Sequence, residues 1–332
     1  MTHSDHRTAV SRRPGPGRDA VRAPEADQPA KERLPSSHRP DPSDRRPRTG
    51  TVPERARRTA AAGVLACGLL IAACSGADRT TDDRVGGIAE STGDRRPAAQ
   101  RIEQLKVKVL EALPHDRKAF TEGLEIVAGT LYESTGLAGR SSMRAGPPGR
   151  KPGVRTALPA PLFGEGISVI GRTLWQLTWR NGIAIERDAR TLAELRRVPY
   201  PDEGWGACLQ RDRHRLVTSD GSARLAFRDP GTLASRGEVT VTEEGRPVTG
   251  LNELECVGTA VYANVLPTDR ILRIDPATGA VTASIDASGL LHDDEIVEGS
   301  VLNGIAAVPG TDQFLVTGKF WPRMFRVAFV PA

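Results

Sequence analysis

A two-strand unit that recurs five times is the feature of this 332-residue sequence that most restricts its fold. Each copy has a polar turn, an apolar strand, a tight turn and a second strand that ends in polar residues. The copies read FTEGLEIVAGTLYESTG, FGEGISVIGRTLWQLTW, EGWGACLQRDRHRLVTSDGS, GLNELECVGTAVYANVLPTD and VLNGIAAVPGTDQFLVTGKFW. Aligning them on Gly123, Gly166, Gly206, Glu253 and Gly304 gives steps of 43, 40, 47 and 51 residues. A period of this size built from strands is typical of β-propellers.

We therefore predict an all-β fold, a five-bladed β-propeller, over residues 105–332. A strand near Lys106–Leu110 is expected to complete the last blade and close the ring, because closure leaves no long sheet edge exposed. Turn residues at 229–232 and 275–279 mark outer hairpins. The sequence of this region has no long amphipathic helical pattern, so little helix is expected.

This fold predicts a ring of polar and aromatic side chains at one end of the central channel. The turn that leads into each innermost strand brings one residue to the channel mouth, and the second strands end on the same face. The first set is Glu122, Glu165, Trp205, Asn252 and Asn303, and the second is Thr178, Trp179, Asp220, Thr268, Asp269 and Lys319. Such a convergence of carboxylates, amides, an amine and indoles is expected to bind a small ligand. Trp175 is expected to pack in the core.

The N-terminal region has a different organisation. Residues 1–53 hold nine of the 25 prolines and few large apolar residues, which is typical of a disordered basic tail. Residues 54–74 combine arginines with an apolar stretch that ends in Ile71-Ala72-Ala73-Cys74, as in a bacterial lipoprotein signal. We expect lipidation of Cys74, export, anchoring to the outer face of the membrane, and a linker over 75–104. The signal lies far from Met1, so one hypothesis is that translation begins near Val52.

The net charge of +5 comes from this N-terminal region. Residues 1–58 hold 14 of the 46 Lys and Arg and 8 of the 41 Asp and Glu, which leaves 32 basic and 33 acidic residues for the rest of the chain. The expected propeller is therefore nearly neutral and lacks the basic surface that a nucleic-acid-binding domain needs. A nucleic-acid partner is not expected.

Cysteines and histidines in the domain predict no metal-dependent chemistry. Cys208 and Cys256 fall on expected inner strands, and we interpret them as buried free thiols, with a disulfide as the alternative. His115, His214 and His292 have no spacing that resembles a zinc site, and a surface or loop position is expected for each of them. The acidic segment 292–295 is interpreted as a solvated loop, with a structural calcium ion as the alternative.

Short motifs along the domain resemble one known family. The runs PHDRKAFTEGL, LYESTGLAGRSS, FGEGI, QLTWR, SDGSARLAFRDP, LNELE, VYANV, TDRILRIDPATG, SGLL, LNGIA and FLVTGKFWP resemble the plant and bacterial type of glutaminyl-peptide cyclotransferase. The resemblance covers about Val107 to Pro331. It implies a five-bladed propeller that converts the N-terminal glutamine of a peptide or protein into pyroglutamate and releases ammonia.

The resemblance also implies roles for particular residues. By this resemblance, Glu165 is the essential acid, Asn252 is the asparagine that binds the substrate, and Lys319 is the lysine of the cavity. The aromatic walls match Phe120, Trp179 and Trp205. Two positions depart from the family pattern, since Glu122 replaces the glutamine of FTQG and Leu266 stands where tryptophan is usual. The Gly/Pro-rich segment 144–153 is a further departure, because a regular outer strand is expected there.

These residues predict acid/base catalysis without a required cofactor. Glu165 would pass a proton from the attacking α-amine to the leaving amide nitrogen, while Asn252 and Lys319 hold the amide oxygen. The substrate-binding set would be Phe120, Glu122, Trp179, Trp205 and Leu266. A monomer is expected. Two alternatives are a propeller that binds a ligand without turnover and a metal-dependent propeller hydrolase such as a lactonase.

Overall fold

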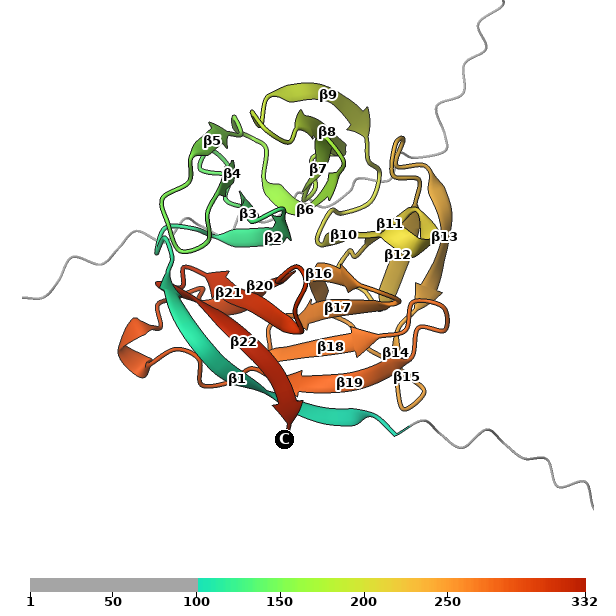
Figure 1. The fold of residues 1–332 in the computed structure, drawn as a ribbon. Coiled ribbons are helices and arrows are strands. Elements are labelled where there is room, and N and C mark those ends of the chain that lie inside the picture. The colour runs from blue at the N-terminus through green and yellow to red at the C-terminus, as the bar shows by residue number, and fades with distance from the viewer. Residues whose placement is uncertain (1–100) are drawn as a thin grey trace, which may run out of the picture. The chain divides into compact units, whose positions relative to one another are not determined.

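The computed structural model describes residues 101–332 (Figure 1). The predicted tail at 1–53, the signal at 54–74 with Cys74, and the linker up to residue 100 lie outside the described residues. No helix within 101–332 has the length and apolar character needed to cross a membrane.

The described chain is all-β, as expected, and its first three sheets each contain four antiparallel strands in sequence order. The first sheet comprises β2 (Thr121–Val127), β3 (Thr130–Thr135), β4 (Ser142–Gly146) and β5 (Val154–Ala157). The second comprises β6 (Gly164–Ile170), β7 (Thr173–Thr178), β8 (Ile183–Asp188) and β9 (Glu194–Pro199). The third comprises β10 (Ala207–Gln210), β11 (Arg215–Thr218), β12 (Arg224–Arg228) and β13 (Ser235–Thr240). Each sheet is therefore built from neighbours in the chain.

The remaining long strands form one eight-stranded sheet, in the order β16-β17-β18-β19-β1-β22-β21-β20. One half comprises β16 (Leu251–Val257), β17 (Ala260–Val265), β18 (Arg270–Ile274) and β19 (Val281–Asp286), and the other comprises β20 (Val301–Ala307), β21 (Gln313–Lys319), β22 (Arg323–Pro331) and β1 (Glu103–Pro114). Two short strands, β14 (Thr242–Glu243) and β15 (Arg246–Pro247), pair separately. Two 3-10 helices span Arg211–Arg213 and Asp293–Glu295.

Strand β1 joins the two halves of the eight-stranded sheet. It pairs antiparallel with the C-terminal strand β22 and parallel with β19. The predicted pairing of the first strand with the end of the chain is thus confirmed, although β1 is longer than the segment expected from the sequence. The first strand of each four-stranded sheet, β2, β6 and β10, and the first strand of each half of the eight-stranded sheet, β16 and β20, face a common centre (Figure 1). This arrangement is compatible with a propeller.

Apolar side chains fill the spaces between neighbouring sheets. Leu124 and Leu131 of the first sheet pack against Leu315 and Met324 from β21 and β22. Trp175 is buried, as predicted, and its indole N–H donates to the carbonyl of Pro230 at 2.8 Å. Apolar residues at alternating positions of a second strand point to one face of its sheet, and that face packs against a neighbouring sheet.

Glycines at the centre allow the innermost strands to approach one another closely. The Gly166 N–H donates to the Trp205 carbonyl at 2.7 Å. A Cβ atom at Gly123 would lie 2.9 Å from the backbone nitrogen of Ile167, and one at Gly206 would clash with the carbonyl of Asn252. Larger residues at these positions would push the strands apart, and with them the side chains that the strands carry.

Cys208 and Cys256 form a disulfide, so the interpretation of these residues as free thiols was wrong. Cys208 lies on β10 and Cys256 on β16, and their Cα atoms are 5.4 Å apart. The sequence places the two cysteines 48 residues apart and does not show that these two innermost strands lie side by side. The bond covalently links neighbouring sheets.

We expect Cys208→Ser/Cys256→Ser to lower the free energy of unfolding by about 2–4 kcal/mol, because the crosslink restricts the unfolded chain. Denaturant titration followed by tryptophan fluorescence measures this loss. A reductant should weaken the wild type by a similar amount and leave the double variant unchanged. Equal unfolding midpoints for the oxidised wild type and the double variant would contradict the expectation.

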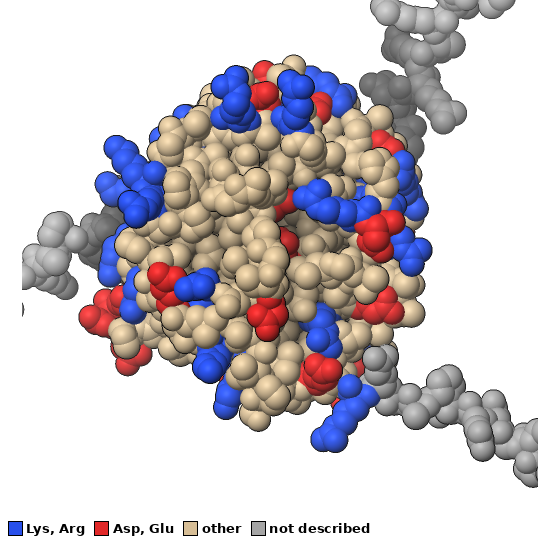
Figure 2. Space-filling model, viewed as in Figure 1, with Lys and Arg blue, Asp and Glu red and all other residues tan. Residues whose placement is uncertain are grey.

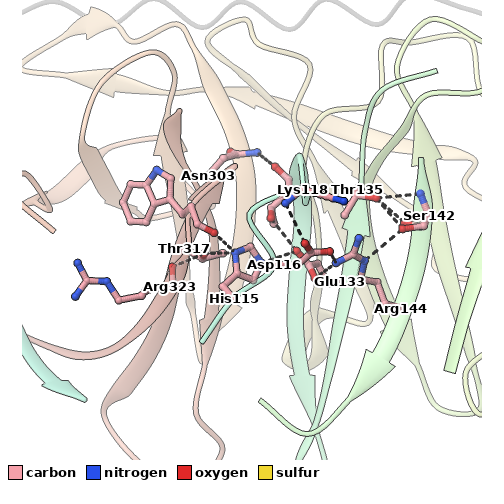
Figure 3. A network of polar contacts seen from close by, with 12 residues as sticks. His115, Asp116, Lys118, Glu133, Thr135, Ser142, Arg144, Asn303, Thr317 and Arg323 are labelled. Carbon is pink, nitrogen blue, oxygen red and sulfur yellow. Dashed lines mark hydrogen bonds and ion pairs between the residues drawn. The ribbon is translucent and has the colours of Figure 1, made fainter. Parts of the chain in front are cut away.

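His115 lies in the loop that follows β1, which is one of the positions expected for it, but its side chain is buried there, whereas His214 and His292 are exposed. The His115 side chain is 3% exposed, and its Nε2 lies 2.9 Å from a carboxylate oxygen of Glu133. Figure 3 shows the ring between Thr317 and Glu133, with Arg144 on the far side of the carboxylate. Burial lowers the pKa of His115, but the Glu133 carboxylate outweighs this and raises it above its ordinary value. His115 therefore belongs to a buried ionic cluster.

Candidate active site

Four polar side chains occupy matching positions near the start of the innermost strands. They are Glu122 on β2, Glu165 on β6, Asn252 on β16 and Asn303 on β20, and each is at most 5% exposed. Each lies where the pairing of its strand with the next one shifts register. Such β-bulges rotate a side chain away from its ordinary alternation. The repeat thus gives one re-aimed polar residue in each of the first two sheets and one in each half of the eight-stranded sheet.

Lys319 lies at the end of β21 and is bonded to Glu122. Its ammonium is 2.8 Å from Oε1 of Glu122, and the Asn303 amide donates to Oε2 at 3.0 Å. The same ammonium lies 4.5 Å from the centre of the Phe120 ring. Burial raises the pKa of Glu122 to about 7, although Lys319 opposes this shift. Glu122 is thus part of a buried ion pair.

Glu165 is in a different state from Glu122. Within residues 101–332 its carboxyl group makes no hydrogen bond or ion pair, although the side chain is buried. Burial raises the pKa of Glu165 well above its ordinary value, and the nearby Glu122 raises it further, while Lys319 partly opposes the shift. The structure therefore brings Glu122, Glu165 and Lys319 within electrostatic reach of one another. Glu165 is the free acid of this group.

Asn252 has an unused acceptor. Its side-chain Oδ1 is buried and has no hydrogen-bond partner among the described residues. Its backbone carbonyl accepts a 2.6 Å hydrogen bond from the Ser219 hydroxyl, which fixes the residue in place. Since buried polar atoms are rarely left unpaired, this atom is available to a ligand.

Half-buried aromatic rings lie beside the buried polar group. The Phe120 ring packs edge-on against Phe163 at 6.1 Å and against Phe320 at 5.1 Å, and Phe163 packs against Trp179 at 5.6 Å. Phe163 and Phe320 were not among the expected site residues. A signal for Phe163 was present, because it precedes Glu165 by two residues as Phe120 precedes Glu122. The rings form an apolar wall next to the acids.

Glu203 is a further site residue that the sequence analysis missed. Its carboxylate accepts hydrogen bonds from the indole N–H groups of Trp179 at 3.1 Å and Trp205 at 3.2 Å. Arg180 holds the other oxygen of the same carboxylate at 2.6 Å and stacks on the Trp179 ring. Glu203 therefore fixes both indoles relative to each other.

Other predicted members of the ring have different surroundings. The Thr178 hydroxyl donates to the carbonyl of Ile183 within its own sheet, and Asp220 bonds to Ser222 and Arg224. Thr268 and Asp269 are exposed. Leu266 follows β17 and is half-buried, with its backbone N–H bonded to Gly250. Figure 2 shows acidic atoms set back near the centre of one face, surrounded mainly by uncharged side chains.

The fold and this group of residues define an all-β protein in which several sheets contribute to one polar site with an aromatic wall. The family model for glutamine cyclotransferase matches residues 85–329, and this chain belongs to that family. It is 36% identical over 253 residues to glutaminyl-peptide cyclotransferase of Arabidopsis thaliana, covering 72% of this chain and 75% of the relative. It is also similar to the crystal structure of Myxococcus xanthus glutaminyl cyclase, with a TM-score of 0.64, 35% identity, and coverage of 70% of this chain and 100% of that chain.

Proposed function

We propose that this protein is a glutaminyl-peptide cyclotransferase, an acyltransferase that converts an N-terminal glutamine into pyroglutamate and releases ammonia. The observation that carries the proposal, beside family membership, is the buried carboxyl of Glu165, which has no hydrogen-bond partner within 101–332 and has a raised pKa. We also propose that the three four-stranded sheets and the two halves of the eight-stranded sheet are five blades of a propeller.

The raised pKa of Glu165 suits the first proton transfer of this reaction. The α-amine must lose a proton as it attacks the side-chain amide carbon, and its ordinary pKa is about 7.7–8.0. Transfer from such an ammonium to a carboxylate of ordinary pKa would cost about 5 kcal/mol. Because burial raises the pKa of Glu165, the proton affinities of donor and acceptor become closer and this cost falls.

The same proton then completes the reaction. The new bond joins the α-nitrogen to the side-chain carbonyl carbon, and the bond from that carbon to the amide nitrogen breaks. Glu165 gives its proton to the departing nitrogen, which also takes the second proton that the α-nitrogen loses on ring closure and leaves as ammonium, so the carboxyl returns to its starting state. No net proton is taken up by the enzyme in this cycle.

The remaining groups stabilise and position the substrate. Lys319 carries a positive charge in a buried site, where it would stabilise negative charge on the amide oxygen. The Oδ1 atom of Asn252 is an acceptor and would receive an N–H of the substrate, while its amide nitrogen can assist Lys319. Phe120, Trp179 and Trp205 would hold the glutamine side chain in a folded conformation that favours ring closure.

An assay of ammonia release tests the proposed function. The purified protein is incubated with a dipeptide that begins with glutamine, with and without a metal chelator. Release of ammonia that the chelator does not reduce supports the proposal. A protein that binds the dipeptide without turnover would instead be a binding module, and activity that the chelator abolishes would indicate a metal-dependent enzyme.

We expect Glu122→Gln to shift the pH dependence of the reaction. Loss of the Glu122 charge removes one cause of the raised pKa of Glu165, and it also frees Lys319, whose charge lowers that pKa. The limb of the pH profile of kcat/KM that reports Glu165 should therefore move to lower pH. Profiles of ammonia release for the two proteins measure the shift. An unchanged profile would show that the two carboxyl groups do not interact.

A further inference from the structure

A basic groove lies on the first sheet, outside the group of residues described so far. Its volume is about 760 Å³. It is lined by Asp116, Lys118, Gly136, Leu137, Gly139, Arg140, Ser141, Arg144, Lys151, Pro152, Arg155 and Ala157. We refer to these residues as the basic groove. The connection between β4 and β5, residues 147–153, contributes Lys151 and Pro152.

The charge of the basic groove is strongly one-sided. Lys118, Arg140, Lys151 and Arg155 are exposed, and none of them forms an ion pair within residues 101–332. The single acidic residue of the lining, Asp116, is bonded to the buried Arg144 at 3.0 Å. Figure 2 shows Lys and Arg side chains gathered at the left of the molecule, beside the first sheet. Four cationic side chains therefore remain free to meet an anionic partner.

The basic groove adjoins the candidate active site through Gly136. This residue lines the groove, and its N–H donates to the Phe120 carbonyl at 2.8 Å. A Cβ atom at Gly136 would lie 3.1 Å from Cγ of Glu122 and would overlap the Phe163 ring. The aromatic wall of the active site and one wall of the groove are thus two sides of the same short segment. A peptide whose first residue lies among the acids has the groove within reach of its following residues.

We propose that the basic groove binds acidic side chains that follow the N-terminal glutamine of the substrate, so that acidic peptides are preferred substrates. This inference rests on the proposed function and names the substrate class for it. The reason is charge complementarity next to the site of reaction, since four unpaired cations would repel a basic peptide and attract an acidic one. Exposed ion pairs are individually weak, so the preference is the sum of several contacts.

The expected preference is about tenfold in kcat/KM for Gln-Ala-Asp-Asp-Ala over Gln-Ala-Ala-Ala-Ala at low salt. The preference should appear as a lower KM for the acidic peptide with kcat unchanged, because the groove does not touch the reacting atoms. It should also decline as the salt concentration rises, because the charges are exposed to solvent. A Gln-Ala-Lys-Lys-Ala peptide should react less efficiently than the neutral peptide.

The test compares the wild type with Arg140→Ala/Lys151→Ala/Arg155→Ala. A matched control, Arg172→Ala/Arg190→Ala/Arg213→Ala, removes three exposed arginines that lie in connections of the second and third sheets. The groove variant should lose the tenfold preference and keep the wild-type kcat for the dipeptide Gln-Ala, while the control variant should keep both. Retention of the preference in the groove variant, or its absence in the wild type, would overturn the inference.

The dipeptide separates this inference from the proposed function. It has no residue that could enter the groove, so a wild type that fails to turn it over contradicts the proposed function itself. Turnover of the dipeptide without any preference for acidic peptides contradicts only the role of the groove. Sedimentation with vesicles of anionic phospholipid tests a second partner for the groove. If the wild type binds the vesicles, the groove variant does not, and acidic peptides are not preferred, then the groove binds a membrane surface and the proposal is overturned.

Discussion

Glu165→Gln should lower the rate of ammonia release by about 10²–10⁴-fold and leave the protein folded. The amide has nearly the same shape as the carboxyl group but cannot accept the amine proton and return it to the leaving nitrogen. The Glu165 carboxyl makes no hydrogen bond within 101–332, so the change removes no contact that holds the fold. Steady-state ammonia release and thermal unfolding are the two measurements.

Glu111→Gln is a suitable control for this variant. Glu111 lies on β1, is exposed, and pairs with Arg326 away from the candidate active site. The control should keep both wild-type activity and wild-type unfolding temperature. Wild-type turnover by Glu165→Gln would remove Glu165 from the proposed mechanism, whatever the fold of the protein.

Lys319→Met should reduce kcat by about 10²–10³-fold, because the substrate oxygen loses its positively charged partner. The same change leaves Glu122 buried without its counter-ion, which typically costs about 3–5 kcal/mol of stability. Activity and stability therefore fall together in the single variant. Ammonia release at saturating dipeptide, together with denaturant unfolding, measures both losses.

The double variant Glu122→Gln/Lys319→Met separates the two losses. It removes both charges of the buried pair, so its stability should return close to that of the wild type. Its kcat should stay low, since no cation faces the substrate oxygen. Recovery of activity along with stability would mean that Lys319 acts only by neutralising Glu122, and it would contradict the role proposed for the ammonium.

The local repeat was enough to predict much of this architecture. Strands that are neighbours in the chain pair with each other in every sheet, so the alternation of apolar residues and the turn signals report contacts that the sequence holds close together. The repeat also placed Glu122, Glu165, Asn252 and Asn303 at matching positions. Closure by β1 and β22 was predictable because an unpaired first strand would expose a long edge.

The repeat did not predict which site residues form ion pairs and which remain without a partner within residues 101–332. Glu122 and Lys319 are 197 residues apart in the chain and form an ion pair, whereas Glu165 at the matching position remains free. The β-bulges that re-aim these residues depend on register, which a list of apolar positions does not give. Glu203 does not lie at a position that recurs in the repeat. Its role became visible only from the hydrogen bonds that its carboxylate accepts from two indole N–H groups.

The sequence by itself determined the all-β class, the period of the repeat and the matching positions of Glu122, Glu165, Asn252 and Asn303, because these follow from the pairing of strands that are adjacent in the chain. The tertiary structure decided which side chains form ion pairs, which cysteines form the disulfide, and that His115 is buried beside Glu133. Those outcomes depend on contacts between different sheets. Their partners are far apart along the chain, and only the packing of the sheets sets their distances, their burial and their pKa values.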